Sequence, residues 1–222
     1  MGSFRIYQLG LSSVYVSELG VIDAIKSRDK LKYSFPDHDN QRKIAKGFTS
    51  KSGEGFNNVV GAIGGLLICT CMPPLHVCKY LSCGQTNFRC HRKDKFGLNM
   101  QAICDDELRF TWAEIKWPGA SSDYLAWMTS WLCKMLEDNI VTKTIIDGFC
   151  IIGDNAYVKK KYMTVPLKGS PCGHEDGYNF YLSQLHITIE RAFGVLVHRW
   201  LILRAPLVIP LQKVPALVES LL

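Results

Sequence analysis

The sequence predicts an α/β domain built around a mixed sheet with helices on both sides. The stretch Val59–Ile68 is apolar and rich in β-branched residues, as in strands buried on both faces of a sheet. Gly97–Pro118 and Phe149–Asp154 have the composition of further strands. Two helical patterns, one opening near Asp123 and one containing Glu190, are expected to pack across this sheet.

The glycine pair Gly64-Gly65 interrupts the central apolar stretch. A glycine pair between β-branched runs is typical of a tight turn. We therefore predict two short strands around this pair, with the central strand Val59–Ile63 ending at Gly64.

The segment before the central strand is predicted to be helical. Apolar residues at three- and four-residue spacings indicate a helix within 11–35. Pro36 interrupts this pattern, and Asp37 or Asp39 is then expected to cap a second helix that runs through Phe48. The chain thus divides into a helical lead, residues 1–50, and a main domain, residues 51–222.

A hairpin and a helix start are predicted in the middle of the chain. Phe96–Cys104 and Phe110–Trp117 form the two strands, turning at 105–107. The following turn leads into a helix for which Ser122 or Asp123 is the N-cap.

The last third of the chain is predicted to contain a short strand, a loop and a long helix. The strand is Phe149–Ile152, and residues 159–177 are interpreted as a loop. The helix begins at Asn179 and is ended by Pro206, and a final segment reaches Leu222 in mid-helix.

Composition is that of a single globular domain. The 222 residues are 47% hydrophobic and 21% charged, with a formal net charge of +6. No apolar run reaches the ~18–20 residues of a membrane helix, and the N-terminus lacks the layout of a signal peptide. We expect a soluble intracellular protein whose mild basicity is compatible with a polyanionic partner.

The order of strand ends and acidic residues indicates a metal site. A carboxylate at the end of the central strand, another at the turn before the helix at Asp123, and a third at Glu190 would suit Mg²⁺, which prefers oxygen ligands. Two such ions activate water and stabilise the leaving oxygen during phosphodiester cleavage. The first of these positions, however, is occupied by Gly64.

Five segments of the chain match a set of sequence patterns that occur together in one family. These segments are Val59–Ile68, Phe88–Asp105, Trp117–Asp123, Gly153–Tyr157 and Ile189–Trp200. The patterns, in the same order, are V-G-A-I-D-G, R-K-x-K followed by N-x-Q-A-x-C-D, P-G-S-x-x-D, G-D-x-x-Y and I-E-R-A-F-G-x-L-x-x-R-W. In these segments the chain resembles the PIF/Harbinger transposases and the nucleases derived from them.

The resemblance implies an RNase H-like fold and a metal-dependent DNA endonuclease or transposase with a triad of two aspartates and one glutamate. Asp123 would be the second carboxylate and Glu190 the third, both ligands of Mg²⁺ or Mn²⁺. Gly64 replaces the first aspartate, so weakened metal binding and impaired catalysis are expected. Asp105 or Asp154, each at the end of a strand, is a possible substitute for the missing ligand.

The resemblance also implies a nuclear protein that acts on DNA, with sequence recognition supplied by a Myb-like partner. Two other hypotheses remain open. Gly64 is compatible with a non-catalytic DNA- or protein-binding module on the same scaffold, and also with a non-functional remnant of a transposase.

Each candidate residue has a structural alternative. Asp123 is suited to capping a helix, Glu190 to an ion pair with His186 or Arg191, and Asp154 to a turn. The cysteines between 69 and 90 lack repeated zinc-ligand pairs and are interpreted as thiols. The tryptophans are interpreted as core packing. The basic residues are interpreted as solvated loops or phosphate contacts: Arg89, Arg92, Lys93, Lys95, Lys159, Lys160, Lys161 and Lys168.

Overall fold

A mixed sheet of six strands forms the centre of the molecule. The computed structural model describes residues 17, 20–22, 24, 33–52, 55–80, 83–169 and 173–222. The strands run in the order β4-β3-β1-β5-β6, and β2 also pairs with β3. Pairs within β1, β3 and β4 are antiparallel, whereas β1, β5 and β6 are parallel. The strands are β1 Val59–Cys69, β2 Arg89–Cys90, β3 Lys95–Cys104, β4 Phe110–Pro118, β5 Cys150–Ile152 and β6 Met163–Thr164.

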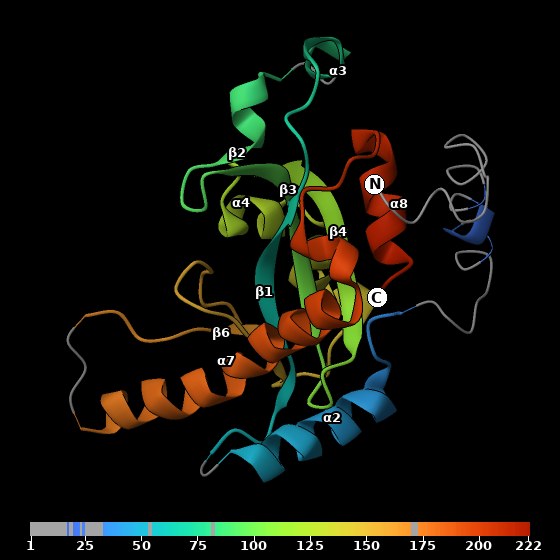
Figure 1. The fold of residues 1–222 in the computed structure, drawn as a ribbon. Helices are drawn as coiled ribbons and strands as arrows, with labels where there is room; N and C mark the ends of the chain where they lie inside the picture. The colour runs from blue at the N-terminus through green and yellow to red at the C-terminus, as the bar shows by residue number, and fades with distance from the viewer. Residues whose placement is uncertain are drawn as a thin grey trace.

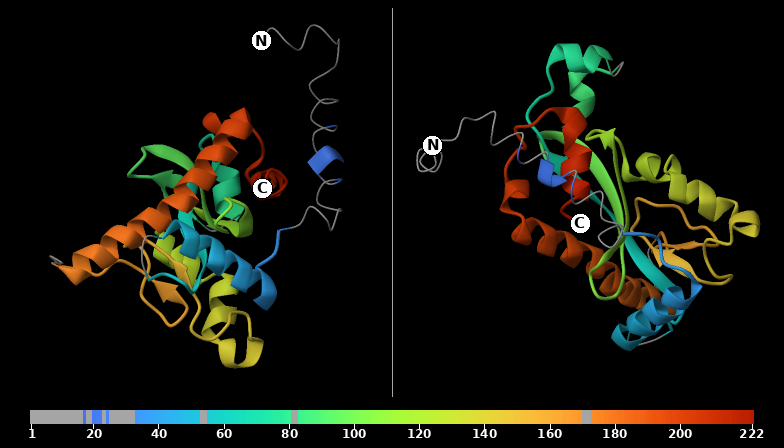
Figure 2. Two further views of the ribbon diagram at one scale, coloured as in Figure 1. Left: turned by 90° about the horizontal axis from the view of Figure 1, so that it is seen from below. Right: turned by 90° about the vertical axis from the view of Figure 1, so that its right-hand side faces the viewer.

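Helices cover both faces of this sheet (Figures 1 and 2). The long helix α7 packs with α2 and α8 on one face, and α4 and α5 pack on the other. No helix in the described ranges has both the length and the apolar composition needed to span a membrane. The helices are α2 His38–Lys51, α3 Leu75–Tyr80, η2 Gln85–Phe88, α4 Asp123–Met128, α5 Trp131–Glu137, α6 Asn139–Thr142, α7 His174–Arg199, η3 Leu201–Arg204, η4 Leu211–Lys213 and α8 Val214–Glu219.

The central strand does not end at Gly64. Strand β1 is one continuous element of 11 residues that passes straight through the glycine pair. Gly64 pairs with Ala102 and Gly65 with Gln101 of β3, so the antiparallel ladder holds both glycines extended. The prediction of a turn here was wrong because the long neighbouring strand β3 outweighs the local tendency of glycine to form turns.

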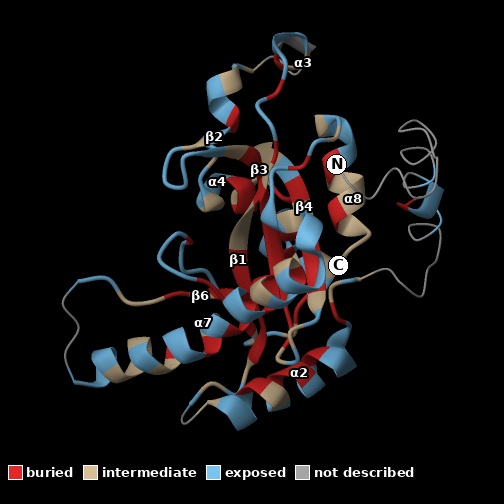
Figure 3. Cartoon of the chain, viewed as in Figure 1, coloured by how far each residue is buried: buried red, intermediate tan, exposed pale blue. Residues whose placement is uncertain are grey.

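Burial of β1 is confirmed, and buried residues mark the strands of the sheet (Figure 3). The apolar core forms two clusters, one on each face of the sheet. Successive strand residues point to opposite faces. Ala62 therefore packs with Ile189 and Phe193 of α7, while Ile63 packs with Trp112 and other residues beneath α4 and α5.

The predicted hairpin is confirmed, with β3 and β4 flanking the turn at 105–107. The helix after Pro36 is also confirmed, because Asp37 caps α2 by accepting a hydrogen bond from the Asn40 N–H at 2.8 Å. For the N-terminal helix predicted within 11–35, helical backbone is described only at 17, 20–22 and 24, and most of the remainder lies outside the described residues.

The C-terminal elements differ from prediction at their ends. Helix α7 begins at His174 rather than Asn179, and β6 lies within the segment interpreted as a loop. The final helix α8 ends at Glu219, so Leu222 is not in mid-helix. Glu175 and Asp176 in the first turn of α7 favour the earlier start, because acidic side chains stabilise helix N-termini.

Candidate functional site

The candidate site lies along an edge of β1 where its parallel neighbour β5 stops. Ala62 pairs with Ile152, the last residue of β5, whereas β1 continues to Cys69. The next pairing is an isolated bridge between Thr70 and Leu207. Such a position, outside the carboxyl end of a parallel strand, commonly forms a binding crevice in α/β folds. Gly64 lies at this edge, one step along β1 from Ile63.

Helix α7 packs over Gly64. A β-carbon at Gly64 would lie 3.2 Å from the Ile189 side chain and 3.3 Å from that of Phe193. Glu190 follows Ile189 and is exposed, and its side chain makes no hydrogen bond or ion pair with any residue that the structure describes. The ion pair considered as an alternative for Glu190 is thus not formed within that part of the chain.

His186 attaches α7 to the same edge. Its Nε2 lies 3.0 Å from the backbone oxygen of Ile63. Because a carbonyl oxygen only accepts, the imidazole is the donor. His186 is four residues before Glu190, so the two side chains share one side of the helix. The contact therefore holds that side of α7 against the strand residue that precedes Gly64.

Asp123 approaches β1 from the opposite face of the sheet. Its Oδ1 accepts hydrogen bonds from Asn99 Nδ2 at 2.9 Å and from Gln101 Nε2 at 2.8 Å. A β-carbon at Gly65 would lie 2.8 Å from both the carboxyl carbon of Asp123 and Gln101 Nε2. Gly65 thus provides the space for this carboxylate.

Ser122, not Asp123, is the N-cap of α4. The Ser122 hydroxyl accepts a hydrogen bond from the Leu125 N–H at 3.2 Å. Capping by serine leaves the next side chain free to turn toward the sheet. The carboxylate of Asp123 is therefore available for the site.

Tyr157 connects the regions around Asp123 and Asp154. Its hydroxyl donates to Gln101 Oε1 at 2.6 Å, and Gln101 in turn donates to Asp123. Asp154 lies in a turn in which its Oδ1 accepts from the Ala156 N–H at 2.9 Å, as predicted for a turn residue. Tyr157 and Gln101 are both buried, so this relay is shielded from solvent.

Burial raises the pKa of the Tyr157 phenol well above its usual value, and the negative charges of Asp123, Asp154 and Glu190 raise it further. The hydroxyl therefore keeps its proton and remains a donor to Gln101. The three carboxylates belong to three different elements, and each of them acts on Tyr157 through its charge.

Replacing Tyr157 by phenylalanine is expected to destabilise the fold by about 1–2 kcal/mol, because buried Gln101 Oε1 loses its donor. Urea unfolding measures this change. Tyr162→Phe is the matched control, since its hydroxyl makes only long contacts, 3.5 Å to Cys133 and 3.4 Å to Glu137. An equal loss in both variants would show that the relay has no special role.

The carboxylates of the candidate site suit Mg²⁺ or Mn²⁺ chemically, but the described residues do not bring three of them together. Carboxylate oxygens are the preferred ligands of these ions. Within the described ranges, however, no three acidic, histidine or cysteine side chains are placed closely enough to hold a metal ion together. Mg²⁺ in proteins is often held by one or two carboxylates, with water and substrate phosphates completing its shell. Glu190 and Asp154 are compatible with that smaller set.

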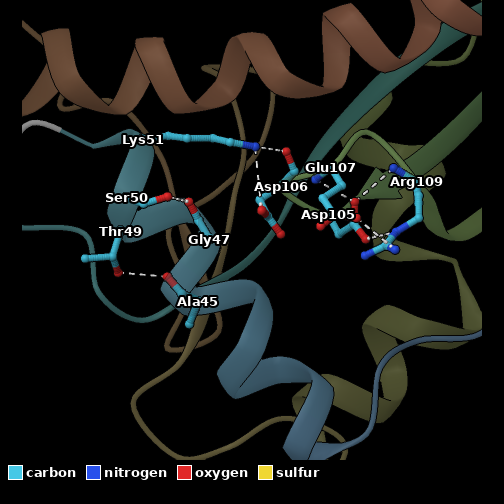
Figure 4. Close-up of polar contacts among 9 residues, drawn as sticks. All are labelled: Ala45, Gly47, Thr49, Ser50, Lys51, Asp105, Asp106, Glu107 and Arg109. Carbon is cyan, nitrogen blue, oxygen red and sulfur yellow. Dashed lines mark hydrogen bonds and ion pairs between the residues drawn. The ribbon is translucent and has the colours of Figure 1, made fainter.

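Asp105 is not available as a substitute ligand (Figure 4). Its Oδ1 accepts from the N–H groups of Glu107 and Arg109, both at 2.9 Å, and its Oδ2 accepts from Arg109 Nε at 2.8 Å. Asp105 also follows Cys104, which pairs with Ala62, so it lies on the amino-terminal side of Gly64 along β1. The carboxylate closes the β3–β4 turn, and the hypothesis that it fills the gap at Gly64 is not supported.

The described cysteines are free thiols. Burial raises the pKa of the Cys104 and Cys150 thiols, the latter to about 11, which lowers their reactivity. Of the tryptophans, Trp112 and Trp127 form a buried edge-to-face pair, as expected for core packing, whereas Trp131 is exposed.

Sequence reasoning assigned no role in the site to Gln101, Tyr157 or Gly65, although each stands in one of the matched motifs, and it considered His186 only as an ion-pair partner of Glu190. A further signal for Gln101 was its polar side chain in a buried strand, since a buried polar side chain needs a partner. The roles of these residues depend on contacts between distant segments, which the sequence does not show.

Comparison with known proteins gives one match. The model of a protein family described as DDE superfamily endonuclease matches residues 75–222. No curated protein and no solved structure matches. The matched range includes Asp123, Asp154 and Glu190, and it begins after β1.

Proposed function

The chain belongs to the DDE superfamily endonucleases, and on this basis we propose that it is a Harbinger-type, transposase-derived DNA endonuclease impaired at Gly64. The observation that carries this proposal is the packing around the glycine pair of β1: α7, which carries Glu190, packs on Gly64, and the Asp123 carboxylate lies against Gly65. Carboxylates at such a strand suit metal-dependent cleavage of a phosphodiester.

We propose that the sheet is an RNase H-like core. The antiparallel strands β4, β3 and β1 are extended beyond β1 by the parallel strands β5 and β6, with helices on both faces. This arrangement places the end of β5 beside the middle of β1, where α7 crosses. A catalytic site at that crossing would draw its carboxylates from the turn after β5, from the start of α4 and from α7.

The residues that would hold the metal are Glu190 and Asp154, with Asp123 on the opposite side of β1. A bound Mg²⁺ or Mn²⁺ would activate the attacking water or DNA 3′-hydroxyl and stabilise the leaving oxygen. His186 holds α7 on the strand edge through the Ile63 carbonyl. Gln101 orients the Asp123 carboxylate, and Tyr157 orients Gln101.

Metal binding tests this assignment independently of catalysis. Mn²⁺ titration followed by the electron paramagnetic resonance signal of the free ion is expected to show binding that Asp154→Asn and Glu190→Gln each weaken by roughly tenfold or more. Asp138→Asn is the matched control, because Asp138 lies between α5 and α6, away from this edge. Binding that none of the three substitutions alters would contradict the proposed ligands.

A second candidate function is that of a non-catalytic DNA- or protein-binding module. Gly64 favours it, because a strand residue without a side chain supplies no metal ligand, and Ile189 and Phe193 crowd the space beside it. DNA binding that is unchanged by EDTA, without cleavage under any metal condition, would support this alternative.

The Harbinger assignment extends the proposal to a nuclear protein that relies on a Myb-like partner for sequence-specific DNA recognition. In a cellular test, a fluorescently tagged chain is expected to accumulate in the nucleus. Exclusion of the tagged chain from the nucleus would contradict this part of the proposal.

A further inference from the structure

We propose that the turn between β2 and β3 holds the phosphate backbone of a DNA strand in a pocket next to Asp123. We call this cavity the turn pocket. The proposal rests on the proposed function, because it names the surface by which that site receives DNA. Nothing in the family match assigns this role to the turn.

The turn pocket lies between two loops at the edge of the sheet. It has a volume of about 350 Å³. One wall is the turn residues His91, Arg92 and Lys93, and the other is 119–123, which ends at Asp123. Gly65–Leu67 of β1 contribute the floor. A backbone seated here would thus pass directly beside the candidate carboxylate.

Backbone hydrogen bonds hold the two walls together. The Gly119 N–H donates to the Gly97 carbonyl at 2.9 Å, and the Ala120 N–H donates to the Asn87 carbonyl at 2.9 Å. These contacts join the 119–123 wall to β3 and to the segment that leads into β2. The pocket is consequently formed before a ligand binds, which reduces the entropy lost on binding.

An internal ion pair fixes the turn and leaves two cations unpaired. Arg89 Nε donates to Asp94 Oδ1 at 2.8 Å, and Asp94 has a left-handed φ of 51°. The charge of Arg89 is thereby neutralised. Arg92 and Lys93, both exposed at the tip, make no ion pair with any residue that the structure describes. Their positive charges are therefore available to a polyanion.

The charges of the two walls are complementary to a metal-bound phosphodiester. Phosphate oxygens bind lysine and arginine on one side, whereas the Asp123 carboxylate on the other side repels them when no metal is present. A strand that lies along the basic wall would carry its next phosphates toward the carboxylates. The turn pocket thus separates backbone binding from the place where the chemistry is proposed to occur.

Fluorescence anisotropy with a labelled DNA duplex in EDTA tests the proposal without requiring cleavage. Arg92→Ala combined with Lys93→Ala is expected to weaken binding roughly tenfold or more, because two phosphate contacts are lost. The slope of log K against log salt concentration should fall by about 1.8 for two contacts. The matched control is Lys43→Ala with Lys46→Ala, two exposed lysines on α2, which lies far from β2 (Figure 1).

Asp123→Asn is a second variant, and its expected effect on DNA affinity is opposite to that of the turn variant. Removal of this negative charge is expected to strengthen metal-free DNA binding severalfold, because the repulsion of the nearby phosphate is lost. Both variants can be checked for folding by circular dichroism before the titration.

The outcomes separate the turn pocket from the proposed function. If the double variants of the turn and of α2 weaken DNA binding equally, the turn pocket is not the DNA-binding surface. The same conclusion follows if the turn variant binds DNA as tightly as the natural chain. In both cases DNA binding by the protein itself would remain. A chain that does not bind DNA at all would overturn the proposed function as well.

Discussion

Gly64→Asp is expected to increase Mg²⁺- or Mn²⁺-dependent nicking of supercoiled plasmid by on the order of a hundredfold or more. The substitution places a carboxylate on the strand edge beside the end of β5, on the side where α7 carries Glu190. Under the proposed function, this carboxylate would supply the anionic ligand that the family pattern has at this position. Ile189 must move slightly, because the new β-carbon would lie 3.2 Å from it, so a stability loss of about 1–3 kcal/mol is also expected.

Gly64→Asn is the matched control for this gain. It has nearly the same shape and crowding as aspartate but no negative charge, so it should not increase nicking. Adding Glu190→Ala to Gly64→Asp should abolish the gain, as should EDTA. Equal activity of the asparagine and aspartate variants would exclude a ligand role for position 64, and the absence of any gain would favour the non-catalytic module. Cutting by the natural chain would instead indicate that another carboxylate, Asp154, already takes the place of the missing ligand.

Asp105→Ala is expected to lower the free energy of unfolding by about 2–4 kcal/mol. Asp105 is 3% exposed, and its carboxylate accepts two backbone N–H groups and the Arg109 guanidinium. Its loss removes the buried acceptor of three partly buried hydrogen bonds in the turn that connects β3 and β4. Urea denaturation at neutral pH measures the change.

Glu107→Ala is the control for the Asp105 substitution. Glu107 also pairs with Arg109, at 2.8 Å, but its side chain is 61% exposed. Exposed ion pairs contribute little, so a change within about 0.5 kcal/mol is expected. A similar loss in both variants would mean that Arg109, rather than the backbone donors, accounts for the effect. If Asp105→Ala keeps its stability, the hydrogen bonds of Asp105 contribute little, and the hypothesis that its carboxylate serves as a substitute metal ligand would have to be considered again.

The local sequence was sufficient to predict those elements whose sequence signals lie within a few residues of one another. The hairpin of β3 and β4 was predictable because two apolar strands flank an acidic turn, and α2 because Asp37 follows Pro36 as a cap. Asp123 and Glu190 were identified as candidates from motif resemblance. The structure links Asp123 to Tyr157 through Gln101 and places Glu190 next to Ile189, which packs against Gly64, while their role as ligands stays a prediction.

Local sequence was misleading where a distant partner overrides a local preference. The pair Gly64-Gly65 indicated a turn, yet pairing with Ala102 and Gln101 keeps β1 extended through it. Asp105 and Asp154 were both strand-end carboxylates for which the sequence also predicted a turn. Only the folded chain shows that the Asp105 carboxylate is fully engaged by Arg109 and by two backbone N–H groups, whereas Asp154 accepts a single local bond from the Ala156 N–H.

The sequence by itself therefore determined the α/β class, the buried central strand and the absence of a carboxylate at position 64. These depend on residue type and on short-range periodicity. The tertiary structure alone decided that Gly65 makes room for Asp123, that Gln101 and Tyr157 orient it, and that His186 fixes α7 at the strand edge. The reason is physical: each of these contacts joins segments far apart in the chain, and a hydrogen bond or steric fit between them exists only after the sheet has assembled.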